Sequence, residues 1–126
     1  MRYLITLFTI STLISCQAQE QKDTKDLDPF TDISNEQAHE IVKAKADLQI
    51  IDVRQNAEVA GGMIAGAIQM DISKPKFYEQ IETLDKNKPV LVYCAAGGRS
   101  KTAQEIMQEA GFTEVYNLKN GYERWK

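Results

Sequence analysis

The chain has 126 residues, 43% of them hydrophobic, and a formal net charge of −3. This length suits one modest globular domain and excludes a second full domain. A slightly acidic chain offers no basic surface for DNA or RNA, so we expect no nucleic-acid partner.

The amino terminus has the layout of an export signal. Arg2 precedes an apolar stretch over residues 3–14, which is shorter than the ~20 residues that a membrane-spanning helix needs. The stretch ends in Leu-Ile-Ser-Cys, which resembles the bacterial lipobox, where the signal is cut before the cysteine and that cysteine receives a lipid. We therefore expect a lipoprotein-type signal peptide at residues 1–15 and a membrane anchor at Cys16. This predicts an extracytoplasmic, lipid-anchored protein of the bacterial cell envelope; the alternative is an ordinary secretory signal and a soluble periplasmic or secreted protein.

A polar segment follows the predicted signal. Residues 17–28 are rich in Gln, Lys, Asp and Glu and contain almost no large apolar side chain. Such a segment cannot bury enough surface to order itself. We expect a flexible tether over residues 16–28 and one folded domain over residues 29–126.

Short strands and helices alternate along the predicted domain. Ser34 and Gln37 match the capping-box pattern at the start of a helix whose apolar face holds Ala38, Ile41 and Val42. Strands are predicted at residues 30–33, 48–53, 67–70, 90–93 and 115–118, and further helices at residues 76–84 and 100–110. This alternation predicts an α/β fold with a central, mostly parallel sheet of about five strands and helices on both faces.

Cys94 ends the apolar strand predicted at residues 90–93, immediately before two glycines and a helix. Backbone N–H groups converge on a side chain in such a corner, and the start of a helix adds about half a positive charge. Both favour the thiolate, whereas an ordinary cysteine with a pKa of about 8.5 is only about 3% ionised at neutral pH. Ligand crevices in open parallel sheets lie at these strand ends. We expect Cys94 to be catalytic and the substrate to be bound by Ala95, Ala96, Gly97, Gly98, Arg99 and Ser100.

The two cysteines and the single histidine limit the alternatives. If Cys16 is lipidated, Cys94 is the remaining thiol, and its retention outside the cytoplasm favours reactivity over a structural role. If Cys16 is not lipidated, a disulfide with Cys94 stays open, as does a buried inert cysteine. His39 lies on a predicted helix far from Cys94, which disfavours a Cys-His protease. No cluster has metal-ligand spacing, so we expect no metal and no cofactor.

Several segments, in order, resemble the signatures of the rhodanese family. They are Ile-Asp-Val-Arg at residues 51–54 with Glu58, Gly-Met-Ile-Ala-Gly-Ala-Ile at 62–68, the loop at 94–100, and Val-Tyr-Asn-Leu-Lys-Asn-Gly-Tyr-Glu-Arg-Trp at 115–125. Met63 and Ala65 replace the usual histidine and proline. The resemblance covers residues 30–126 and identifies the chain as similar to single-domain rhodaneses.

The resemblance implies a sulfurtransferase fold and activity. The loop cysteine of this family, here Cys94, takes sulfane sulfur from a donor such as thiosulfate as a persulfide and passes it to cyanide or a thiol. It also implies a buried ionic network of Asp52, Arg54 and Glu58 beneath the loop, in which Arg54 and Glu58 form an available pair. We expect these residues to support the loop rather than react.

The length and charge of the loop refine the expected activity. Four residues separate Cys94 from Arg99, whereas the related phosphatases and arsenate reductases have five, so a persulfide is favoured over a phosphate. Ala95 stands where sulfurtransferases commonly carry a cation, so the pocket has less positive charge than that of a thiosulfate specialist. Arg99 is expected either to orient an anionic donor or to clamp loop carbonyls, and Ser100 to cap the helix and donate to the loop.

Two functions from other classes stay open on these residues. One is a catalytically weak or inactive rhodanese-fold binding module, and the retention of Cys94 and Arg99 argues against it. The other is a thiol redox protein, which the lack of a Cys-x-x-Cys pair disfavours. The oligomeric state is left open.

Overall fold

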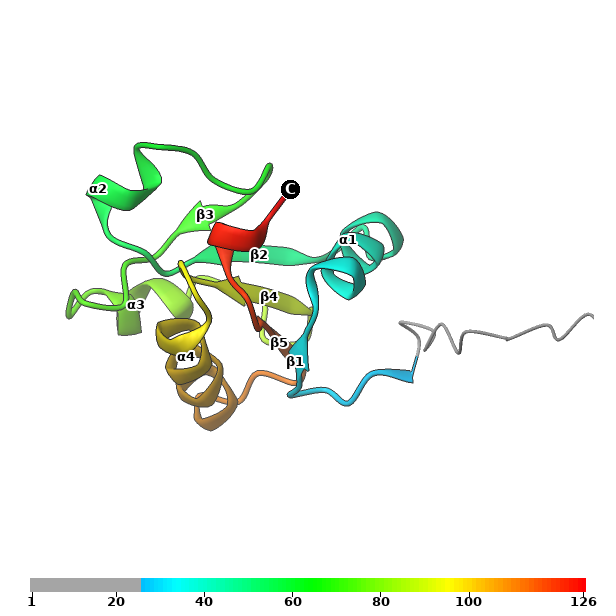
Figure 1. Cartoon of the computed structure of the whole chain (residues 1–126). Coiled ribbons are helices and arrows are strands. Elements are labelled where there is room, and N and C mark those ends of the chain that lie inside the picture. The colour runs from blue at the N-terminus through cyan, green and yellow to red at the C-terminus, as the bar shows by residue number, and fades with distance from the viewer. Residues whose placement is uncertain (1–25) are drawn as a thin grey trace, which may run out of the picture.

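A computed structural model of the protein describes residues 26–126. It shows a twisted sheet with helices on both faces (Figure 1). The sheet has five strands in the order β1-β5-β4-β2-β3, and neighbouring strands are parallel. The strands are β1 (Asp32–Ile33), β2 (Gln49–Asp52), β3 (Ile68–Gln69), β4 (Val90–Tyr93) and β5 (Val115–Leu118). The predicted α/β architecture is confirmed.

The predicted signal peptide, the lipid anchor at Cys16 and most of the predicted tether lie outside the described residues. Within residues 26–126, no helix has the length and apolar character needed to cross a membrane.

Four α-helices connect the strands of the described chain, and a short 3₁₀ helix follows the last strand. They are α1 (Asn35–Ala44), α2 (Asn56–Val59), α3 (Phe77–Ile81), α4 (Gly98–Glu109) and η2 (Tyr122–Arg124). The capping box of α1 is confirmed, since the Ser34 hydroxyl accepts from the Gln37 amide while the Gln37 side chain accepts from the Ser34 amide. The prediction that the last long helix starts at Ser100 is wrong. The helix begins at Gly98, because Gly97 takes a φ of 101° and turns the chain directly from the loop into the first helical residue.

Each face of the sheet carries its own apolar core. Along β4, Val90 and Val92 pack with residues of α3 and α4, whereas Leu91 and Tyr93 pack with residues of α1. This is the period of two that a pleated strand imposes. Cys94 continues the alternation and belongs to the core on the α4 side. The strand therefore directs the thiol toward the start of α4 and the Tyr93 ring toward the opposite face.

The parallel register brings the loops that follow β2, β4 and β5 to one edge of the sheet. Asp52 pairs with Tyr93, and Val92 pairs with Asn117, so these three strands end close together. Figure 1 shows the yellow start of α4 near the red carboxyl-terminal segment. This edge is where ligands bind in open parallel sheets.

Candidate active site

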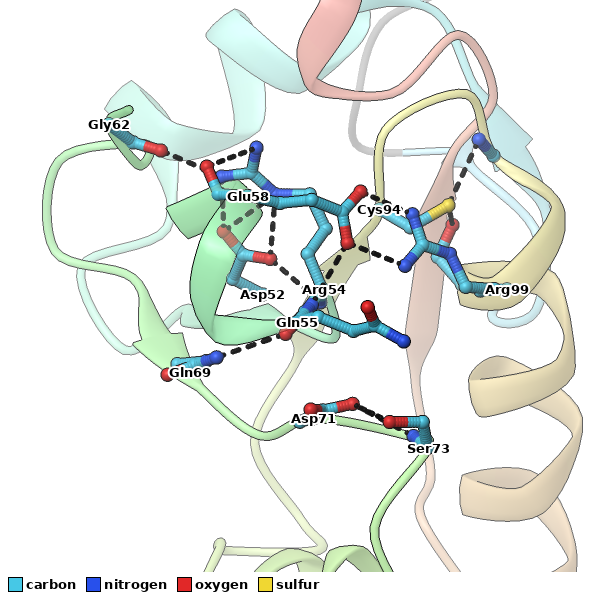
Figure 2. Close-up of polar contacts among 12 residues, drawn as sticks. Asp52, Arg54, Gln55, Glu58, Gly62, Gln69, Asp71, Ser73, Cys94 and Arg99 are labelled. Carbon is cyan, nitrogen blue, oxygen red and sulfur yellow. Dashed lines mark hydrogen bonds and ion pairs between the residues drawn. The ribbon is translucent and has the colours of Figure 1, made fainter. Parts of the chain in front are cut away.

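The Cys94 sulfur lies in a small cradle of hydrogen-bond donors at the end of β4 (Figure 2). The residue is only 2% exposed. The Gly97 amide donates to the sulfur at 3.1 Å and the Ser100 hydroxyl at 3.4 Å. Burial raises the pKa of the thiol, but hydrogen bonds from the Ser100 hydroxyl and from the amides of Ser100, Ala96 and Gly97 lower it by more. The pKa of Cys94 is therefore below its ordinary value, which favours the thiolate.

The carboxyl-terminal turn, residues 119–124, gives the loop its shape through backbone hydrogen bonds. The carbonyl of Cys94 accepts from the Tyr122 amide at 2.8 Å, and the carbonyl of Ala95 accepts from the Glu123 amide at 3.0 Å. In a trans peptide the carbonyl and the next N–H point in opposite directions. Because the Ala95 carbonyl faces the turn, the Ala96 amide faces the sulfur. The turn thus orients the Ala96 amide toward the Cys94 sulfur without contacting the sulfur through a group of its own.

Two glycines allow the loop and the turn to approach this closely. A Cβ at Gly97 would overlap the backbone oxygen of Lys119, and a Cβ at Gly121 would overlap the backbone of Ala95 and Ala96. Both glycines also have positive φ angles, 101° and 64°. Gly98 has open space around its missing Cβ, so its neighbours do not require a glycine there.

Arg99 forms an ion pair with Glu58 at the mouth of the loop. Its Nη1 and Nη2 donate to the two carboxylate oxygens at 2.8 and 2.7 Å, and both side chains are about one-third exposed. The pair lowers the pKa of Glu58 to about 2, helped by a hydrogen bond from the Gln55 amide, and raises the pKa of Arg99. The expectation that Arg99 clamps loop carbonyls is wrong, because within residues 26–126 its side chain donates to the Glu58 carboxylate.

A second ion pair, Asp52–Arg54, lies buried beneath the loop. Arg54 Nη2 and Asp52 Oδ2 are 2.8 Å apart, and their side chains are 5% and 0% exposed. The expected pairing of Arg54 with Glu58 is wrong, since Arg54 meets only the Glu58 backbone carbonyl, at 3.5 Å. Arg54 instead donates to the Gly62 carbonyl at 2.7 Å, and its guanidinium lies 4.2 Å from the centre of the Tyr122 ring. The predicted network is therefore two separate pairs, of which Asp52–Arg54 ties β2 to the carboxyl-terminal turn.

Ser100 is the third residue of α4 and not its cap, which is Gly97. Its side chain is fully buried and donates to Cys94. The expected donation to the loop is thus confirmed, whereas the expected capping role is wrong because the helix starts earlier.

Substituting Ser100 by alanine is expected to raise the pKa of Cys94, because it removes a donor that stabilises the thiolate. We expect alkylation by iodoacetamide at pH 6–7 to slow by about threefold to tenfold, the range for losing one hydrogen bond of about 1 kcal/mol. The rates of the two proteins should converge at high pH, where both thiols are ionised. A pH profile of the alkylation rate measures this, and profiles that coincide at every pH would contradict the assignment.

The other side chains considered for chemistry lie elsewhere. His39 stacks on Trp125 with ring centres 3.9 Å apart, in keeping with a residue packed at an edge. Among residues 26–126, no group of three or more His, Cys, Asp or Glu side chains is arranged to hold a metal.

Sequence reasoning missed one feature of the site. It treated Gly121 as part of a closing signature, whereas the turn that contains Gly121 and Tyr122 holds the loop. Asn120-Gly121 is a strong turn signal. That signal predicts a turn but not what the turn contacts.

Comparisons with known proteins agree with this fold. Residues 34–126 match the family model described as the rhodanese-like domain. The chain is 41% identical over 97 residues to thiosulfate sulfurtransferase GlpE of Coxiella burnetii, covering 77% of this chain and 88% of the relative. It is 37% identical to thiosulfate sulfurtransferase GlpE of Stutzerimonas stutzeri over 98 residues, covering 77% and 85%. The crystal structure of a rhodanese-related protein from Thermoplasma volcanium superposes with a TM-score of 0.66 at 28% identity, covering 76% of this chain and 90% of the other. The chain belongs to the family of rhodanese-like domains.

Proposed function

We propose that the protein is a sulfurtransferase that moves sulfane sulfur from a donor such as thiosulfate to cyanide or a thiol through a persulfide on Cys94. The observation that carries the proposal is the buried Cys94 sulfur, which accepts hydrogen bonds from the Gly97 amide and the Ser100 hydroxyl. Membership of the family and the names of the relatives support the same activity. No cofactor enters the proposed reaction.

The first half of the proposed reaction loads the sulfur. The Cys94 thiolate attacks the outer sulfur of thiosulfate, a new S–S bond forms, and the old S–S bond breaks with its electron pair leaving on sulfite. The negative charge that remains on the protein moves to the terminal sulfur of the persulfide. Amides of the loop that already lower the pKa of Cys94 are placed to stabilise this charge too.

The second half returns the protein to its starting state. An acceptor anion attacks the terminal sulfur, the S–S bond to Cys94 breaks, and the electron pair returns to the cysteine as thiolate. With cyanide the product is thiocyanate, and with a thiolate it is a new persulfide. Neither half needs an oxidant or a reductant.

The experiment that tests the proposal is the intact mass of the purified protein before and after thiosulfate, followed by cyanide. We expect a gain of one sulfur atom that peptide mapping places on Cys94, and its loss as thiocyanate appears. If no donor adds sulfur to a folded protein whose Cys94 is still alkylated by iodoacetamide, the sulfurtransferase proposal fails. The binding-module function then becomes the better one.

We also propose that the mature protein is held at the cell envelope by a lipid on Cys16, cut from a signal at residues 1–15. The support is the lipobox-like Leu-Ile-Ser-Cys at the end of the apolar stretch. Expressed in a bacterium, the full chain should partition with membranes, and its Cys16→Ser variant should not. Equal partitioning of the two proteins would overturn the proposal.

A further inference from the structure

Three cations near the reactive loop have carboxylate partners. Arg99 pairs with Glu58, Arg54 pairs with the buried Asp52, and Lys101 contacts the Asp32 carboxylate at 3.4 Å. Ala95, directly after the cysteine, contributes no charge. The described residues thus surround Cys94 with hydrogen-bond donors, while each of these cations is neutralised by a partner.

Glu58 occupies the Nη1–Nη2 edge of the Arg99 guanidinium. A guanidinium binds planar oxyanions through two parallel N–H groups, and Glu58 takes one hydrogen bond from each of Nη1 and Nη2. Two oxygens of the tetrahedral sulfonate end of thiosulfate can span the same pair of N–H groups, so a thiosulfate that approaches this edge competes with Glu58. A donor with two negative charges also meets the Glu58 carboxylate itself, which repels it more strongly than a donor with one.

The position and the charge of Glu58 are both fixed. It lies on α2, where its carboxylate accepts from the Gln55 amide at 3.0 Å and so closes a capping box on its own helix. Its pKa of about 2 lies below the ordinary value of 4.5, so the ion pair is intact above about pH 5 and is lost only as the pH falls toward 2. Protonation therefore does not release Arg99 in the range where the reaction is measured.

From this geometry we infer that Glu58 determines the sulfur-donor preference of the protein, by neutralising Arg99 and disfavouring dianionic donors. The inference rests on the proposed sulfurtransferase function and names its substrate class: sulfane-sulfur compounds with one negative charge or none, such as thiol persulfides. With a persulfide donor, the Cys94 thiolate attacks the outer sulfur, the S–S bond of the donor breaks, and the donor thiol leaves with the electron pair as thiolate. Glu58 is a positioning residue in this scheme, since it acts through Arg99.

Two donors that differ mainly in charge test the inference. Thiosulfate is a dianion, and methanethiosulfonate is a monoanion of similar size in which a methyl group replaces one oxygen. In Glu58→Gln, kcat/KM for thiosulfate should rise about tenfold relative to kcat/KM for methanethiosulfonate, the order expected for removing one partly screened charge a few ångströms away. Glutamine keeps an oxygen to accept from the Gln55 amide, so α2 retains its cap.

A matched variant controls for the change in net charge. Glu105 is an exposed residue of α4, and Glu105→Gln should leave the ratio of the two donors unchanged. The ratio is the decisive readout because a purely structural role of Glu58 would lower both activities together. A ratio that stays constant or falls in Glu58→Gln overturns the inference.

A second, independent test uses the wild-type protein alone, so it does not depend on the folding of a variant. Each donor's kcat/KM is divided by the rate constant of that donor with a free thiol in solution, which removes the difference between the leaving groups. The normalised value should be larger for methanethiosulfonate, and the reverse order overturns the inference. If neither donor places sulfur on Cys94, the proposed function itself has failed, so the two failures are distinguishable.

Discussion

Substituting Cys94 by serine is expected to abolish sulfur loading and transfer, with a loss of activity of at least about a thousandfold. Serine fits the space and can still accept from the Gly97 amide and the Ser100 hydroxyl. Its oxygen is nevertheless a far weaker nucleophile near neutral pH, and no persulfide can form on it. Thiocyanate production from thiosulfate and cyanide measures the loss, and intact mass should show no added sulfur.

The control for this prediction is the fold of the Cys94→Ser variant. The residue belongs to the core on the α4 side, so thermal unfolding must show that the variant is folded at the assay temperature. Transfer that persists in a folded Cys94→Ser protein would contradict a persulfide on Cys94. It would move the reaction to another group.

The sheet could be predicted because its residues carry a simple pattern. The predicted bounds of β4 and β5, residues 90–93 and 115–118, agree with the structure, since runs of branched and aromatic residues buried on both faces of a parallel sheet are easy to recognise. The start of α4 was predicted too late. Glycines weaken a helix by propensity, whereas here Gly97 starts the helix with a positive φ at its close approach to the backbone of Lys119.

The identity of the reactive residue was also accessible from the sequence, whereas the pairing of charges around it was not. Two acids and two arginines allow more than one pairing. The structure assigns Arg54 to Asp52 because both are buried at the end of β2, and this leaves Glu58, which is partly exposed on α2, to Arg99. Which acid pairs with which arginine depends on the direction in which each side chain points. That direction is set by loops whose sequences have no repeating pattern.

The contact between the loop and the carboxyl-terminal turn is the feature that sequence reasoning was least able to predict. It joins segments far apart in the chain through backbone atoms, the amides of Tyr122 and Glu123 and the carbonyls of Cys94 and Ala95. Backbone contacts impose no side-chain pattern except at glycine. Their traces in the sequence are therefore the glycines at the points of closest approach, Gly97 and Gly121.

Substituting Gly121 by alanine is expected to damage stability and activity together. The new Cβ would overlap the backbone of Ala95 and Ala96, which cannot move aside as a flexible side chain can, and the φ of 64° adds strain. We expect the free energy of unfolding to fall by about 2–4 kcal/mol, which lowers the melting temperature by roughly 10–25 °C in a domain of this size. Below that temperature, transfer should fall at least about tenfold, because displacing Ala95 turns the Ala96 amide away from the sulfur.

Gly111 provides the matched control for the Gly121 prediction. It ends α4 with a φ of 96°, yet a Cβ there would meet nothing within 4 Å. Gly111→Ala therefore carries the strain without the overlap, and should cost about 1 kcal/mol of stability with transfer unchanged in the folded protein. The alkylation rate of Cys94 at neutral pH should fall in Gly121→Ala and stay constant in Gly111→Ala. If the two variants behave alike in both measurements, the carboxyl-terminal turn does not hold the reactive loop, and the thiolate is stabilised by the start of α4 alone.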